Sequence, residues 1–181
     1  YTIYFYSANA LTGTLWISIV PLVAGAFLVM YAYKYSWDRL AHAKHLHMAI
    51  GAVGTAIFLF VPLIFLANIN LMLFPDRWTQ VRGFISALWL PNVLPRFLHF
   101  LLACMAVTAL FMLGYFTRRG YPVETMFQHF DRPGLRRMFY AVAFGATLLQ
   151  VIAGPLVLFT LPAQGLSIPL YVIISVGALL A

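Results

Sequence analysis

The stretch RFLHFLLACMAVTALFMLGYF, residues 96–116, decides the fold class of this chain. It is apolar almost throughout. As a helix rising about 1.5 Å per residue, it is long enough to cross the roughly 30 Å hydrocarbon core of a bilayer. It carries one imidazole ring, His99, in its first turn. Because an ionisable ring inside hydrocarbon is costly, we expect His99 to face other helices and to have a partner there.

The composition of the 181-residue chain excludes a soluble globular domain. Only 8% of the residues are charged and 64% are hydrophobic, whereas a soluble domain carries about 25% charged residues. The net charge of +7 comes from basic residues between apolar stretches, which favours membrane topology over binding to nucleic acid. We therefore expect an all-α polytopic membrane helical bundle. The chain starts without methionine and stops inside an apolar run, so we expect it to be a fragment.

Apolar stretches of similar character recur along the chain. They predict a single membrane domain over residues 1–181 with about five spans, the last of them cut off: residues 11–33, 46–74, 96–117, 138–161 and 166–181. Between the second and third spans, residues 78–92 are too few to cross the membrane and include two tryptophans. Indole rings suit the membrane interface, so we expect this segment to lie on the membrane surface.

Basic residues predict the orientation of the spans. Residues 34–45 contain three Lys or Arg and residues 118–137 contain five. The segment between the second and third spans contains three if Arg96, at the start of the third span, is included, and the last turn contains none. By the positive-inside rule, we expect residues 34–45 and 118–137 to be cytoplasmic. His99 then lies near the outer face.

Other polar residues of the spans have less specific interpretations. Asn68 and Asn70 predict hydrogen bonds between helices. The run HAKHLH contains His42, His45 and His47, but a lysine lies within it, and such a run is more typical of lipid headgroup contact than of a metal site.

Short motifs, taken in order, resemble subunit I of the cytochrome bd quinol oxidases. Those around the second span are Trp37-Asp38-Arg39-Leu40, His45-Leu46, Ala67-Asn68, Met72 and Pro75. The succession Asn92-Val93 and Arg96-Phe97-x-His99 is similar to the family's helix whose histidine is an axial ligand of the low-spin heme b. Gly145 and Leu148-Leu149-Gln150 are also similar. The resemblance covers about residues 4–161.

The resemblance implies a membrane cytochrome subunit of a respiratory complex that holds heme b, with His99 as ligand of the heme iron. It also implies electron transfer, with exchange with the quinone pool left open. The implied location is the inner membrane of a bacterium or archaeon, and the implied partners are other membrane and redox subunits and lipid. Arg96, one turn before His99, either neighbours a heme propionate or extends to lipid headgroups.

Two features of that family are absent. Where the family has acidic residues serving the high-spin hemes, the matching positions here are Ser18 and Ala26, and residues 162–165 replace the long loop that forms the quinol site. Two alternatives therefore stay open beside electron transfer: a heme-free membrane anchor or scaffold, and a complete quinol oxidase whose other parts lie outside this chain. A transporter is disfavoured, because the spans contain almost no acidic or basic side chain.

Overall fold

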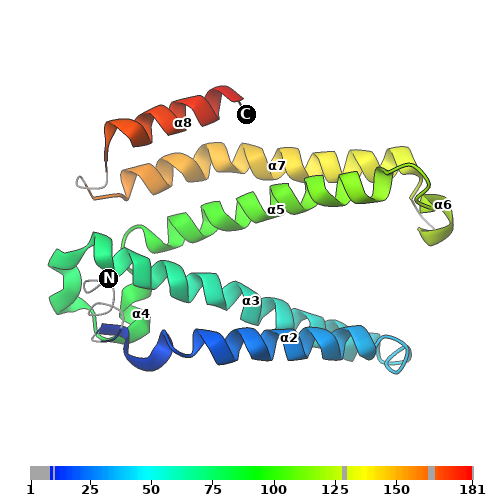
Figure 1. Ribbon diagram of the computed structural model, residues 1–181, viewed down its shortest axis with the longest axis horizontal. Helices are drawn as coiled ribbons and strands as arrows, with labels where there is room; N and C mark the ends of the chain where they lie inside the picture. The colour runs from blue at the N-terminus through cyan, green and yellow to red at the C-terminus, as the bar shows by residue number, and fades with distance from the viewer. Residues whose placement is uncertain (1–8, 10, 128–129, 163–165, 181) are drawn as a thin grey trace. The chain divides into compact units, whose positions relative to one another are not determined.

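The computed structural model describes residues 9, 11–127, 130–162 and 166–180, and these residues form helices and turns with no strand among them (Figure 1). This confirms the predicted all-α fold. The chain divides by its internal packing into two compact units, residues 1–93 and residues 94–181. Residues 128–129 of the expected cytoplasmic segment, residues 163–165 of the expected turn and residue 181 of the last expected span lie outside the described residues.

The first unit is built on a hairpin of two helices, α2 (Ile19–Tyr35) and α3 (Lys44–Leu73). The contacts run in opposite directions along the two helices, since Gly51 faces Tyr33 and Gly54 faces Met30. A Cβ atom at Gly51 would lie 2.8 Å from Cε2 of Tyr33, and one at Gly54 would lie 2.7 Å from Sδ of Met30. The absence of side chains at these two positions therefore permits the close approach of α2 and α3.

The start of α2 differs from the expected span. A short 3-10 helix, η2 (Gly13–Leu15), precedes it, and α2 itself begins at Ile19, so that Pro21 lies in its first turn. Proline is tolerated there because the first-turn N–H groups have no partner within the helix. The helix therefore begins eight residues after the start of the expected span at residue 11, and Pro21 fits its first turn.

The carboxyl end of α3 packs against the segment that follows it. That segment forms η3 (Pro75–Gln80) and α4 (Gly83–Leu88), where a surface segment over residues 78–92 was expected. The buried cluster that joins them to α3 contains Ala67, Leu71, Phe74, Val81, Ala87, Leu90 and Val93. The indole Nε1 of Trp78 donates a hydrogen bond of 2.6 Å to the carbonyl oxygen of Leu71. The location of residues 78–92 at the membrane surface stays a prediction.

The second unit contains α5 (Val93–Thr117, which begins at the last residue of the first unit), α6 (Val123–Met126), α7 (Arg132–Phe159) and α8 (Ile168–Leu180). Both long helices begin before the expected spans. Pro95 lies in the first turn of α5, and Pro133 lies at the start of α7. The side chain of Asp131 caps α7, because its Oδ1 accepts a hydrogen bond of 2.9 Å from the N–H of Gly134.

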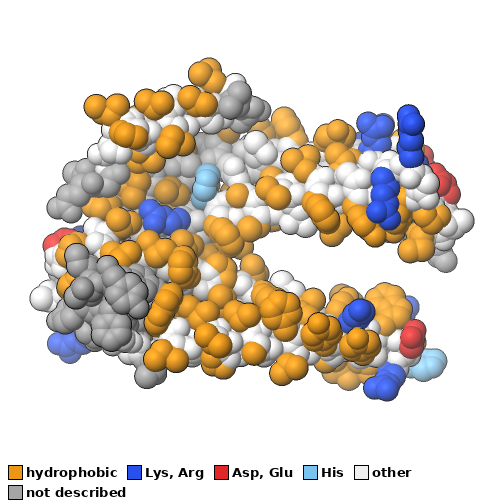
Figure 2. All heavy atoms as spheres, in the orientation of Figure 1, with side chains coloured by type: hydrophobic (Ala, Val, Ile, Leu, Met, Phe, Trp, Pro, Cys, Tyr) orange, Lys and Arg blue, Asp and Glu red, His pale blue; other side chains and the backbone are white. Residues whose placement is uncertain are grey.

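Three helices among the described residues are long and apolar enough to cross a membrane: α3 with 30 residues, α5 with 25 and α7 with 28. The apolar helices α2 and Ile168–Gly177 are shorter. Many large hydrophobic side chains of these helices are exposed, as Figure 2 shows for one face. Side chains of this kind suit contact with lipid. The protein is therefore an integral membrane protein.

Candidate functional site

His99 lies on the packed face of α5. The buried residues of this helix after His99 are Leu102, Ala106, Ala109 and Leu113. Together with His99 they are spaced three or four residues apart, the spacing that lines up side chains on one face of a helix. His99 itself is half-buried, whereas its neighbours Leu98 and Phe100 are exposed. The ring therefore belongs to the packed face of the helix.

The Nδ1 atom of His99 is buried and has no hydrogen-bond partner among the described residues. No described ring stacks on the imidazole either. Leaving a buried polar atom unpaired costs about 1–3 kcal/mol, because the atom has lost its hydrogen bonds to water. The partner expected for His99 is therefore not supplied by the part of the chain that the structure describes.

Arg96 lies one turn before His99 on the same side of α5 and is half-buried. The two ion pairs described in the structure join Arg77 to Asp76 and Arg132 to Glu124, so no described carboxylate neutralises Arg96. The two predicted site residues thus form a pair on one helix face: an imidazole and an unpaired guanidinium.

This pair fits one side of a heme b. A neutral imidazole is a usual axial ligand of heme iron. A guanidinium is suited to a propionate carboxylate. Ala103 and Ala106, one and two turns after His99 on the same side, have short side chains. His99 is the one histidine described in the second unit, since His129 lies outside the described residues.

His47, at the start of α3, is held in a way that the sequence analysis missed. It is 7% exposed, whereas His42 and His45 are exposed. Its ring stacks on that of Tyr33 with centroids 4.2 Å apart, and the ring of Trp37 lies nearly perpendicular to it with centroids 5.2 Å apart. The spacing of Tyr33 and Trp37, one helical turn apart beside a short connection, was the sequence signal for such a cluster.

One ring nitrogen of His47 has a hydrogen-bond partner among the described residues and the other has none. Oγ of Ser36 contacts the carbonyl oxygen of Tyr33 at 3.1 Å and lies 3.1 Å from Nδ1 of His47. Nε2 of His47 is buried without a described hydrogen-bond partner.

The two asparagines near the end of α3 differ in their hydrogen bonds. Oδ1 of Asn68 accepts from Oγ1 of Thr12 at 2.9 Å, and Nδ2 of Asn68 donates to the carbonyl oxygen of Ile64 at 2.9 Å. Asn70 is also fully buried, but neither of its amide atoms has a partner among the described residues. The predicted contacts of asparagines with other parts of the bundle therefore occur at Asn68.

Comparison of the chain with family models, with curated proteins and with solved structures finds no match.

Proposed function

We propose that this chain is a membrane cytochrome subunit of a respiratory complex, similar to subunit I of the cytochrome bd oxidases, which holds heme b and transfers electrons. The observation that carries the proposal is His99. Its ring lies on the packed face of an apolar helix, and its buried Nδ1 has no partner among the described residues. A polar ring at such a position is expected to serve a partner.

Each residue of the pair has a separate role in this proposal. His99 would hold the heme iron through one ring nitrogen, while its other ring nitrogen would donate a hydrogen bond to a carbonyl oxygen or a water molecule and so orient the ring. Arg96 would neutralise a propionate carboxylate. Bound heme b supplies one-electron transfer between its ferric and ferrous states.

The proposal extends to location and partners. We assign the chain to the inner membrane of a bacterium or archaeon, with residues 34–45 and 118–137 on the cytoplasmic side, from their excess of Lys and Arg. Other membrane and redox subunits are its proposed partners, and the quinone pool is the proposed donor or acceptor of electrons.

A second function, a heme-free membrane anchor, is favoured by the packing of the first unit. Gly51 and Gly54 permit close contact between α2 and α3, and Ala26 of α2 is fully buried. Small residues at helix contacts are typical of membrane helices that serve to pack. In this function the buried nitrogen of His99 pairs with a side chain of a partner subunit.

A reduced-minus-oxidised visible spectrum of the purified complex tests the two functions. The comparison uses the wild type, His99→Ala and the control His47→Ala, which removes the other buried membrane histidine. We expect a b-type band that is lost in His99→Ala and retained in His47→Ala. A band of full intensity in His99→Ala overturns the role of His99. A wild-type subunit without heme in a pyridine hemochrome assay supports the anchor instead.

Arg96→Gln gives an independent readout of the same proposal. Removing a positive charge beside a propionate favours the ferric state, so we expect the midpoint potential of the heme to become more negative while the band is retained. An unchanged midpoint potential would mean that Arg96 does not neighbour the heme.

A further inference from the structure

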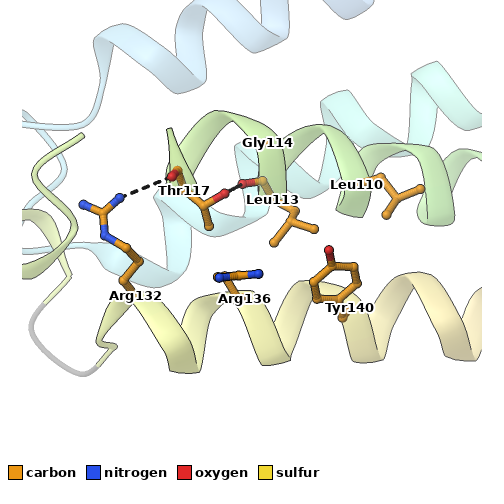
Figure 3. A pocket seen from close by; sticks show the side chains of 7 residues that line it. All are labelled: Leu110, Leu113, Gly114, Thr117, Arg132, Arg136 and Tyr140. Carbon is orange, nitrogen blue, oxygen red and sulfur yellow. Dashed lines mark hydrogen bonds between the residues drawn. The ribbon is translucent and has the colours of Figure 1, made fainter. Parts of the chain in front are cut away.

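A pocket of about 340 Å³ lies between α5 and α7, beside the connection that joins them (Figure 3). Its volume is at the lower end of the range found for small-molecule sites, about 300–1,000 Å³. From α5 the pocket is lined by Leu110, Leu113, Gly114 and Thr117, and from α7 by Arg132, Arg136 and Tyr140. α5 therefore contributes two leucines, a glycine and, at its end, a threonine, whereas α7 contributes two arginines and the phenol of Tyr140.

Arg132 is held by the chain. Its Nη1 donates to the carbonyl oxygens of Thr117 and Arg118 at 3.3 and 3.2 Å, and its Nη2 donates to that of Tyr121 at 2.8 Å. Its Nε lies 3.9 Å from a carboxylate oxygen of Glu124. These contacts supply hydrogen bonds to carbonyl groups at the carboxyl end of α5, which have no partner within the helix. The Arg132 side chain that lines the pocket is therefore held in place by the chain.

Arg136 is free to bind a ligand. It lies one turn after Arg132 on α7, and its guanidinium has no ion pair or hydrogen bond with any described residue. The nearby acids are engaged, since Glu124 faces Arg132 and Oδ1 of Asp131 accepts from Gly134. Figure 3 shows that Arg136 and Tyr140 both point from α7 toward α5.

The arginines of the pocket lie at the ends of the two helices, and its leucines lie further along α5, toward the interior of the membrane. Thr117 is the last residue of α5 and Arg132 is the first of α7, so the cationic end lies where both helices leave the apolar region. Leu110 is about two turns further into α5, roughly 10 Å along the helix axis. A ligand that fills this pocket has an anionic group at the helix ends and an apolar group directed into the bilayer.

We propose that this pocket binds an anionic phospholipid, with the headgroup phosphate at Arg136 and the first part of an acyl chain along Leu110 and Leu113. The phenol of Tyr140 donates a hydrogen bond to the phosphate or the ester region. Basic pockets between membrane helices are known to receive anionic headgroups. Five arginines against two acids over residues 117–140 also give this end of the helices a positive field. The proposal is independent of the heme.

Native mass spectrometry of the purified full chain in detergent tests the site, with phosphatidylglycerol and phosphatidylcholine as the probes. We expect phosphatidylglycerol to bind about tenfold more tightly than phosphatidylcholine, and Arg136→Gln to remove most of that preference. The matched control is Arg137→Gln, which makes the same change of charge at the next residue of α7. Both arginines are exposed, but Arg137 does not line the pocket, so we expect less than a twofold effect.

Two further arms separate the lipid from other anions and from a general effect of charge. If Arg136→Gln and Arg137→Gln lower the preference for phosphatidylglycerol equally, the site is overturned. Equal binding of the two lipids to the wild type also overturns it. Displacement of phosphatidylglycerol by millimolar inorganic phosphate would indicate a soluble phosphate and overturn the lipid. Leu110→Trp narrows the apolar end and is expected to weaken lipid binding while the helical circular dichroism signal is retained. Unchanged lipid binding in that variant overturns the place of the acyl chain.

Discussion

The α2–α3 pair and the α5–α7 pair each hold a buried histidine atom, but they hold it differently. His47, in the first pair, has a stacked ring, an edge-on ring and a hydroxyl around it. His99, in the second, has no described ring contact and no described hydrogen bond at its buried Nδ1. The ring of His47 is packed against groups of its own unit, although its Nε2 has no described hydrogen-bond partner, whereas the ring of His99 has none of these contacts with described residues.

The packing of the two pairs differs in the same sense. In the first pair, glycines bring the helices into close contact along α3. In the second, the described contacts gather near the connection between the helices. There the rings of Phe116 and Phe139 stack with centroids 6.0 Å apart and Arg132 binds carbonyl oxygens of the connection, beside the pocket. Close contact of helices leaves no room for ligands, so the second pair is where they are expected.

The largest effect on stability is expected from filling the contact of the first pair. Gly51→Leu forces a side chain against Tyr33, whose ring is already stacked on His47, and we expect it to lower the free energy of unfolding by about 3 kcal/mol. Gly145→Leu on α7 is the control, because a Cβ there meets no atom within 4 Å. Thermal unfolding in detergent gives both values. Equal losses would show that the two pairs are packed alike.

A smaller difference is expected between the two histidines in heme-free protein. His47→Ala removes a stacked ring and the hydrogen bond to Ser36, so we expect a loss of about 2 kcal/mol. Both substitutions remove a buried nitrogen without a described partner, so the difference comes from the ring contacts and the contact with Ser36, which have no counterpart at His99 among the described residues. We expect His99→Ala to change the free energy of unfolding by no more than about 1 kcal/mol. Chemical denaturation of the heme-free variants measures the difference. The comparison fails if His99→Ala costs as much as His47→Ala.

The smallest effect on stability is expected for the two asparagines of α3, in the first pair. Asn68→Leu removes the bonds to Thr12 and Ile64, and we expect a loss of about 1 kcal/mol, as for polar contacts in membrane proteins. Asn70→Leu removes two unpaired amide atoms, so we expect no loss or a small gain. Unfolding of the two variants under the same conditions decides this. A larger loss in Asn70→Leu would show that this amide has a partner outside the described residues.

The sequence was sufficient to predict the long helices, because hydrophobic runs of that length have few other solutions. The helix starts were less predictable. The predicted span began at residue 138, yet Pro133 fits the first turn of a helix and the side chain of Asp131 caps it, so α7 begins at Arg132. Aspartate before proline was the available signal, and it needed the capping rule rather than hydropathy.

Of the candidate site, the sequence could predict what depends on neighbouring residues, but not what depends on contacts between helices. His99 stands out because it is a single ionisable ring in an apolar helix, which is a local property. The enclosure of His47 depends on contacts with Tyr33 and Ser36, and these arise only when α2 and α3 pair. A run of three histidines gives no sign of which ring the pairing will enclose. The difference between Asn68 and Asn70 likewise depends on Thr12, distant in sequence.

The three carbonyl contacts of Arg132 also bear on how the protein is made. The acceptors belong to Thr117, Arg118 and Tyr121, which leave the ribosome before the arginine that binds them. Until α7 has been synthesised, the carboxyl end of α5 depends on water or lipid headgroups for its hydrogen bonds. The order of translation therefore makes the entry of α7 the event that locks α5, so these two helices are expected to mature in the membrane as one inserted hairpin.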